Sequence, residues 1–225
     1  MCIVEDAIKQ AKGKDTLEIG CGDGSYTQII QKYVKSLKSI DLLQMFIDKN
    51  KKENSAPNTE FLLMDASDLK FNDKFFDVVF SSSFHEINHE KQTDVLNEAT
   101  RVLKDDGLLI FIDPTEKSVT NDLFRVFDPN EDHAKRIKKS TSIMKNYMQQ
   151  NGHKIVQYKT GQIDMVFNDI TELNNTMLDW WSDILIPKDD AERQILVNRI
   201  HKTLKGKGLE EKIVTEKIQI YIFRK

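Results

Sequence analysis

Three glycines follow a short apolar run near the start of the chain, and they constrain the fold more than any other feature: Gly20, Gly22 and Gly24. The run, residues 15–19, has the length and apolar character of a buried parallel strand. Glycines directly after such a strand let the backbone turn tightly and let a ligand approach closely. Because ligands of open α/β sheets bind beyond the carboxyl ends of the strands, we expect a ligand loop at residues 18–24.

Strand-like and helix-like segments alternate through the first half of the chain. Alternation of this kind favours right-handed crossovers and a doubly wound α/β fold with a parallel sheet. Further strands are expected at residues 37–40, 59–63, 75–80 and 108–112, and helices at residues 25–36, 44–53 and 90–103.

The regular alternation of strand-like and helix-like segments ends after Pro114. Helical patterns occupy residues 131–150 and 170–205, while residues 154–167 and 213–223 have strand-like patterns. We expect one domain over residues 1–225, in which segments 115–150 and 168–210 form a helical cover over the carboxyl edge of the sheet. A substrate would bind beneath that cover.

Composition excludes several classes of protein. The chain has 225 residues, a formal net charge of −3 and two cysteines, so we expect neither a disulfide framework nor a general attraction to nucleic acid. No run of eighteen apolar residues is present, which predicts no membrane span. The first fifteen residues lack a signal-peptide pattern, and no Cys/His cluster has metal-ligand spacing. A cytoplasmic protein without a metal is expected.

The glycine spacing distinguishes between nucleotide-binding loops. A nicotinamide loop has the spacing G-x-G-x-x-G, but the position of its third glycine is Ser25 here. A phosphate-binding P-loop would end in Gly-Lys-Ser/Thr, which is absent. Glu18, two residues before the first glycine, would repel a pyrophosphate and suits a positively charged ligand, such as the amino acid end of a sulfonium cofactor. A tight turn without a ligand is the plainer alternative.

Acidic residues follow the second and third expected strands. Asp41 could accept hydrogen bonds from both ribose hydroxyls of a nucleoside, although it would also fit an NAD enzyme or a helix cap. Asp65 could bind an adenine amino group, although aspartate is also ordinary in loops. Leu42 and Met45 could supply apolar faces to the adenine ring.

Three segments resemble motifs of the class I S-adenosylmethionine-dependent methyltransferases: residues 17–24, 76–82 and 101–109. They are most similar to the small-molecule branch, which includes quinone-biosynthesis and trans-aconitate methyltransferases. The resemblance implies a mostly parallel, Rossmann-like seven-stranded sheet whose last strand is antiparallel, and S-adenosyl-L-methionine as cofactor. The cofactor-binding residues would be Glu18, Gly20, Cys21, Gly22, Gly24, Asp41, Leu42, Met45, Asp65, Ala66 and Ser81.

A sulfonium methyl group is already activated, so the enzyme's main task is to align an acceptor for direct in-line displacement. A general base would help where the acceptor is a protonated hydroxyl or amine. His85 and Glu86, just past the fourth strand, are the candidate catalytic residues; packing and holding of the loop are their alternative roles.

The identity of the acceptor is the open question. Signatures of adenine-N6, cytosine-C5 and arginine methyltransferases are absent, which favours a small-molecule acceptor and no nucleic-acid partner. The oligomeric state stays open, with a homodimer as one option. Two alternative functions stay open. The protein could bind S-adenosylmethionine or S-adenosylhomocysteine without catalysis, or, as a less favoured alternative, it could be a nicotinamide oxidoreductase.

Overall fold

The computed structural model describes residues 3–180, 187, 189–207 and 213–225. By their internal contacts these residues divide into two compact units. Unit 1 comprises Met1–Asp113, Lys139–Lys159 and Gln219–Lys225, and unit 2 comprises Pro114–Lys138 and Thr160–Ile218. Parts of the expected cover, namely 181–186, 188 and 208–210, lie outside the described residues.

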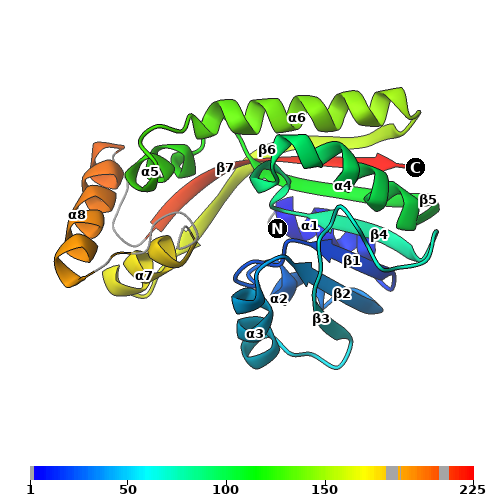
Figure 1. The fold of residues 1–225 in the computed structure, drawn as a ribbon, viewed down its shortest axis with the longest axis horizontal. Helices are drawn as coiled ribbons and strands as arrows, with labels where there is room; N and C mark the ends of the chain where they lie inside the picture. The colour runs from blue at the N-terminus through cyan, green and yellow to red at the C-terminus, as the bar shows by residue number, and fades with distance from the viewer. Residues whose placement is uncertain (1–2, 181–186, 188, 208–212) are drawn as a thin grey trace. The chain divides into compact units, whose positions relative to one another are not determined.

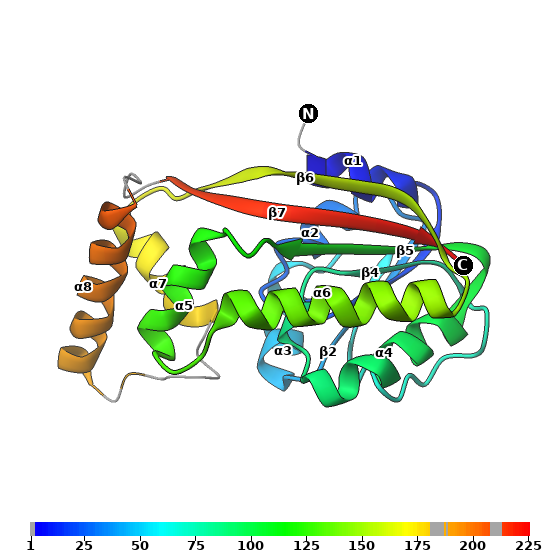
Figure 2. The same cartoon turned by 90° about the horizontal axis from the view of Figure 1, so that it is seen from above.

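A seven-stranded sheet organises the fold, with the strand order β3-β2-β1-β4-β5-β7-β6 (Figure 1). The five strands β3, β2, β1, β4 and β5 pair in parallel. β7 runs against β5, as Figure 2 shows, which confirms the predicted mixed sheet. The strands are β1 (Asp15–Ile19), β2 (Ser36–Asp41), β3 (Thr59–Leu63), β4 (Phe76–Ser81), β5 (Leu103–Pro114), β6 (Lys154–Val166) and β7 (Ile213–Arg224).

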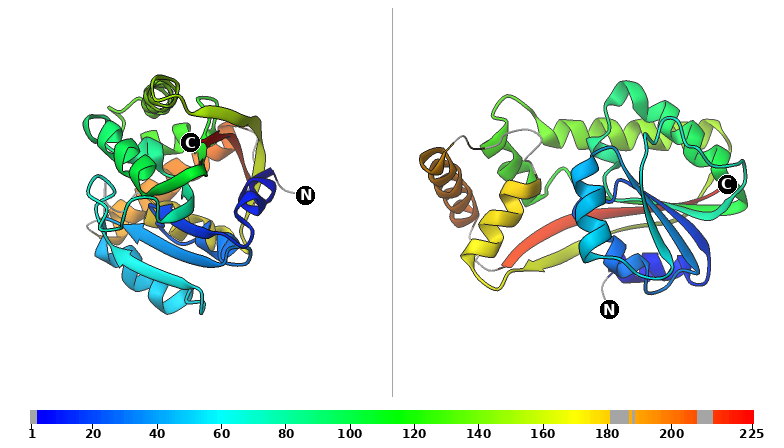
Figure 3. Two further views of the ribbon diagram at one scale, coloured as in Figure 1. Left: turned by 90° about the vertical axis from the view of Figure 1, so that its right-hand side faces the viewer. Right: turned by 60° about the horizontal axis from the view of Figure 1, so that its bottom comes forward.

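Helices cover both faces of the sheet in unit 1. Apolar side chains of α4 and of the second half of α6 share one core cluster with β1, β4 and β5. Figures 2 and 3 show α1 on the opposite face from α4. The helices are α1 (Ile3–Ile8), α2 (Thr27–Ile30), α3 (Gln44–Glu53), α4 (His89–Val102), α5 (Val119–Phe127), α6 (His133–Gln150), α7 (Ile170–Trp180) and α8 (Asp190–Gly206), and the short 3₁₀ turns are η1 (Lys9–Ala11) and η2 (Phe84–Glu86).

The first helix of the parallel half differs from its prediction. We expected a helix over residues 25–36, but α2 has only four residues. After it the chain continues in turns, in which Lys32 and Tyr33 donate backbone hydrogen bonds three residues back. The side chain of Thr27 explains part of this geometry, because its hydroxyl donates to the buried Glu18 and holds the start of α2 against β1.

Unit 2 has its own apolar core. Helices α5, α7 and α8 contribute buried side chains to it, among them Leu123, Phe124, Met177 and Ile200. The helix α5 was not predicted from the sequence. In the described part of the chain, no helix combines the length and the apolar character that crossing a membrane requires.

Candidate active site

The glycine loop lies at the carboxyl end of β1, as predicted from its position after an apolar strand. The backbone N–H groups of Gly20 and Cys21 donate to the carbonyl oxygen of Ile40 at 2.9 and 3.1 Å, which fastens the loop to β2. Gly22 has φ +48°, a conformation that side chains disfavour, and nothing lies within 4 Å of the position where its Cβ would be. The backbone at Gly22 is therefore open to a ligand.

The other two glycines are needed for packing within the protein. A Cβ on Gly20 would collide with the hydroxyl of Ser83, from the segment after β4. A Cβ on Gly24 would collide with the side-chain amides of Asn50 and Asn54, at the end of α3. The three glycines thus serve two purposes, close packing at two positions and open access at one.

Asp41 connects the end of β2 to this loop. Its Oδ2 accepts a hydrogen bond from the backbone N–H of Gly22 at 3.0 Å, and its Oδ1 accepts one from Leu43 at 2.9 Å. A carboxylate offers about four lone-pair sites, so both oxygens retain capacity to accept bonds from ligand hydroxyls. The half-buried Asp41 carboxylate can therefore bind the Gly22 backbone and ribose hydroxyls at the same time.

Glu18 lies fully buried at the end of β1. Its Oε2 accepts hydrogen bonds from the hydroxyls of Thr27 and Ser39, each at 2.6 Å, while its Oε1 has no partner among the described residues. Burial raises the pKa of this carboxyl to about 7, and the two hydroxyls only partly oppose the rise. A buried carboxylate oxygen without a partner fits a ligand that brings a positively charged donor.

Apolar side chains lie next to Asp41, at the carboxyl ends of β2 and β3. Leu42 and Met45 are 65% and 55% exposed, and Leu63, beside Asp41 in the sheet, is 53% exposed. Exposed side chains of this size at a strand end suit the faces of a planar ring. Ala66 follows Asp65 in the turn after β3.

Asp65 is held by its own turn. Its Oδ1 accepts bonds from the backbone and hydroxyl of Ser67 at 2.8 and 2.7 Å, and its Oδ2 lies 3.1 Å from the Lys91 ammonium. The Ser67 hydroxyl and backbone bonds, together with Lys91, lower the pKa of Asp65. The side chain is therefore an anion at neutral pH.

Cys21 and Ser81, both expected at the cofactor, are buried beneath the loop. Burial raises the pKa of the Cys21 thiol, so the thiol stays protonated. The Ser81 hydroxyl donates to the carbonyl oxygen of Ile19 at 3.1 Å, which joins β4 to β1. Both side chains point away from solvent, so a ligand would contact the backbone of the loop and not these side chains.

His85 and Glu86 lie in η2, directly past β4. The imidazole is buried, with Nδ1 2.6 Å from Asp113 Oδ1 and Nε2 3.1 Å from Glu86 Oε1. Burial alone would lower the pKa of His85, but the two carboxylates outweigh it and raise the pKa to about 10. His85 is therefore an imidazolium at neutral pH that donates to both, and the 40% exposed Glu86 is the accessible end of the trio.

Sequence reasoning missed three of the residues that build this site. Asp113 was predicted only as the end of a strand, and Asn50 and Asn54 only as parts of a helix and its end. A signal was present for Asn50, because it is a polar residue on the side of its helix that carries the buried Ile47. Its contacts were not predictable, since its partner Gly22 lies 28 residues away.

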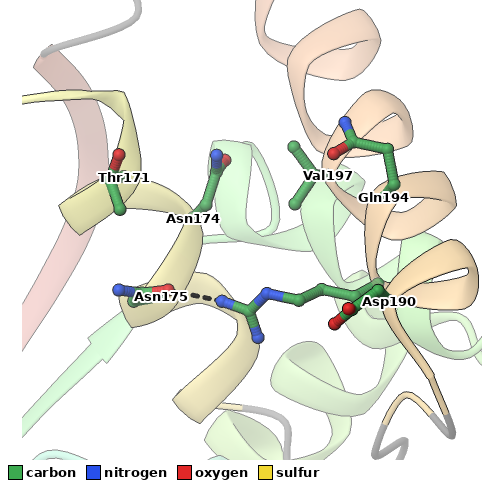
Figure 4. A pocket seen from close by; sticks show the side chains of 7 residues that line it. Thr171, Asn174, Asn175, Asp190, Gln194 and Val197 are labelled. Atoms are coloured by element: carbon green, nitrogen blue, oxygen red, sulfur yellow. Dashed lines mark hydrogen bonds between the residues drawn. The ribbon is translucent and has the colours of Figure 1, made fainter.

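A separate hollow lies within unit 2, between α7 and α8 (Figure 4). Its volume is about 270 Å³. Arg193 of α8 donates to the side-chain oxygen of Asn175 on α7. The lining contains none of the predicted site residues and consists of Thr171, Asn174, Asn175, Asp190, Arg193, Gln194 and Val197.

The sequence matches the family described as a methyltransferase domain over residues 17–111, which contain the glycine loop and extend from Leu17 in β1 to Phe111 in β5. A phthiotriol/phenolphthiotriol dimycocerosates methyltransferase of Mycobacterium tuberculosis is 33% identical over 104 residues, which cover 45% of this chain and 38% of that protein. The match spans about two fifths of the length of that protein and of an uncharacterized protein of Methanocaldococcus jannaschii, which is 37% identical over 114 residues.

Solved structures resemble nearly the whole chain. A candidate methyltransferase from Bacillus halodurans has a TM-score of 0.63 at 17% identity, covering 98% of this chain and 97% of that chain. The N-methyltransferase NodS from Bradyrhizobium japonicum, solved with S-adenosyl-L-homocysteine, has a TM-score of 0.57 at 12% identity, covering 99% and 83%. At these identities the likeness shows the fold alone. Residues 17–111 thus match a methyltransferase domain, and the fold and the loop geometry support a class I methyltransferase that uses S-adenosyl-L-methionine as its cofactor.

Proposed function

We propose that this protein transfers a methyl group from S-adenosyl-L-methionine to a small-molecule acceptor by direct in-line displacement. One observation carries the proposal: the loop that leaves the backbone face of Gly22 open is bonded to the Asp41 carboxylate and follows directly on β1, which ends with the buried, unpartnered oxygen of Glu18 close to it in sequence. Asp41 suits ribose hydroxyls, and Glu18 suits an ammonium group. The pair thus matches a cationic nucleoside better than a pyrophosphate.

We extend the proposal to the cofactor-binding residues predicted from the sequence. Glu18, Gly20, Cys21, Gly22 and Gly24 would surround the amino acid part of the cofactor, through side chain or backbone. Leu42, Met45, Asp65 and Ala66 would surround the adenine, and Ser81 would hold the loop from below. When bound, the cofactor supplies a methyl group that its sulfonium charge activates.

The segment after β4 would meet the acceptor. We assign proton acceptance to Glu86, because its carboxylate is the exposed end of the Asp113–His85–Glu86 trio. His85, held protonated by two carboxylates, is assigned a positioning role, since an imidazolium cannot take a proton. This division refines the expectation from sequence, in which either residue could be the base.

A small-molecule acceptor is supported by the name of a relative, which modifies phthiotriol and phenolphthiotriol dimycocerosates. Segments 115–150 and 168–210 would cover the acceptor within a single domain. The cytoplasmic location, the absence of a nucleic-acid partner and the homodimer option stay predictions from sequence.

The test has two stages. Calorimetry with S-adenosylmethionine, S-adenosylhomocysteine and NAD should show binding of the first two only; binding of NAD alone would overturn the cofactor assignment. A screen for S-adenosylhomocysteine release across acids, phenols, amines and thiols should then reveal an acceptor. If no acceptor of any class leads to S-adenosylhomocysteine release although the cofactor binds, the result would favour the non-catalytic binding protein.

A further inference from the structure

Asn50 is an unusual residue for its place in the chain. It is the seventh residue of the ten-residue helix α3 and is fully buried. Asparagine is among the less favourable residues in a helix interior, by up to about 0.7 kcal/mol relative to alanine. A buried amide is also costly unless it is hydrogen-bonded. A residue that breaks both local preferences points to a role outside its own helix.

The hydrogen bonds of Asn50 show that role. Its Nδ2 donates to the carbonyl oxygen of Gly22 at 2.7 Å and to that of Phe46 at 2.8 Å. Its Oδ1 accepts a bond from Asn54 Nδ2 at 2.7 Å. The second asparagine therefore fixes which way the Asn50 amide points, with the NH₂ group toward the glycine loop.

Gly22 is consequently held from two sides. Its N–H donates to Asp41 on β2, and its carbonyl accepts from Asn50 on α3. Gly24, two residues on, packs so closely on the two asparagine amides that a Cβ would not fit. The polar backbone groups of Gly22 are satisfied by the protein, and its bare Cα face is left for a ligand.

We infer that Asn50, oriented by Asn54, is a positioning residue that preorganises the glycine loop for the cofactor. This inference rests on the proposed cofactor site. A loop that is already ordered spares the ligand the free-energy cost of immobilising it, which is how preorganisation raises affinity. Asn50 itself need not touch the cofactor.

The chain offers a matched control for the test. Asn58 is half-buried and also donates two bonds from Nδ2 to backbone carbonyls, those of Gln31 and Val34, at 3.0 and 3.1 Å. It directly precedes β3 and so lies at the amino edge of the parallel strands, opposite the glycine loop. Asn58→Asp thus removes the same chemistry as Asn50→Asp without disturbing the loop.

Two measurements on the full chain test the inference: calorimetric affinity for S-adenosylhomocysteine, and amide hydrogen exchange at residues 20–24 in the ligand-free protein. Asn50→Asp should lower affinity about tenfold or more, the scale of one hydrogen bond to the backbone, and should speed exchange in the loop. Asn54→Asp should act in the same direction through Asn50. Asn58→Asp should leave both readouts unchanged.

Equal affinities in Asn50→Asp and Asn58→Asp, or unchanged exchange in the loop, would overturn the inference. If Asn50→Asp does not fold, Asn54→Asp decides by the same criteria. Wild-type protein that binds S-adenosylhomocysteine but methylates nothing would refute the proposed activity and leave the role of Asn50 intact. Wild-type protein without any binding would refute the cofactor site, and unchanged exchange would refute the role of Asn50 separately.

Discussion

Replacing Glu18 by glutamine should change the pH dependence of folding. Burial raises the pKa of Glu18 from 4.5 to about 7, and nearby Asp41 and Asp23 add to the rise. Below pH 4.5 the carboxyl is neutral in both the folded and unfolded states, so ionisation has no effect there. Between pH 4.5 and 7 the unfolded chain releases the proton while the native state keeps it, so the native state loses stability as pH rises. Above pH 7 the loss is complete, and the gap between the two pKa values corresponds to about 3 kcal/mol.

Glu18→Gln removes this ionisation and keeps the shape. The amide oxygen can accept the bonds from Thr27 and Ser39, while the NH₂ group takes the place of the unpartnered Oε1. Any constant cost of that NH₂ group is the same at every pH. The free energy of unfolding of the variant minus that of the wild type should therefore rise by about 2 kcal/mol between pH 5 and pH 8.

Urea denaturation of both proteins at several pH values measures this difference directly. Affinity for S-adenosylmethionine should move the other way, falling about 10- to 100-fold at pH 8, because a hydrogen bond to a charged group contributes about 1.5–3 kcal/mol. Glu216→Gln, which changes another buried glutamate bonded to a threonine, should leave the affinity unchanged. Parallel stability curves for wild type and Glu18→Gln would refute the reasoning, since they would mean that Glu18 ionises equally easily in both states.

Four further changes test other parts of the structure. Asp41→Ala should weaken S-adenosylhomocysteine binding about tenfold or more by calorimetry, since it removes the acceptor of the Gly22 N–H bond; unchanged affinity would exclude Asp41 from the site. Gly22→Val should abolish binding, because it strains φ +48° and fills the open face; retained binding would exclude the loop. His85→Gln should slow methyl transfer with cofactor affinity unchanged, and a pH–rate profile that loses no ionisation near neutrality would agree with its positioning role. Leu96→Ala, at a fully buried position in α4, should lower the free energy of unfolding by about 2–5 kcal/mol in urea melts, and a change below about 1 kcal/mol would contradict its place in the core.

The sequence predicted the parallel half of the fold because the signals there are local. Strands β1 and β3 begin and end as expected, and α4 lies within a residue of its predicted start and end. The predicted helix over residues 25–36 was wrong, since α2 ends at Ile30; the bond that holds its start, from Thr27 to the buried Glu18, joins residues of two different elements and was not predictable from the local pattern. Helix α5 was missed although Val119, Leu123 and Phe127 recur at helical spacing, so there the pattern was present and overlooked.

In the candidate site, too, only residues with a local sequence signal could be predicted. Glycine spacing, Glu18 and Asp41 could be found in the sequence, since each stands next to the end of a strand. Asp113 could not be paired with His85, because the two lie 28 residues apart on β5 and in η2, and only the register of the sheet brings them together.

The glycine motif alone does not determine what binds to it. Gly20 and Gly24 are required by neighbours inside the protein, Ser83 and the asparagines of α3, so their presence says nothing direct about a ligand. Only Gly22 faces open space, and its orientation is set by Asp41 and Asn50, which come from β2 and α3. Two chains with the same glycine spacing could therefore hold this backbone differently and bind different nucleotides. The chemical choice lies with Glu18, because a buried carboxyl with a pKa of about 7 and one unpartnered oxygen favours a cation over a phosphate at this position.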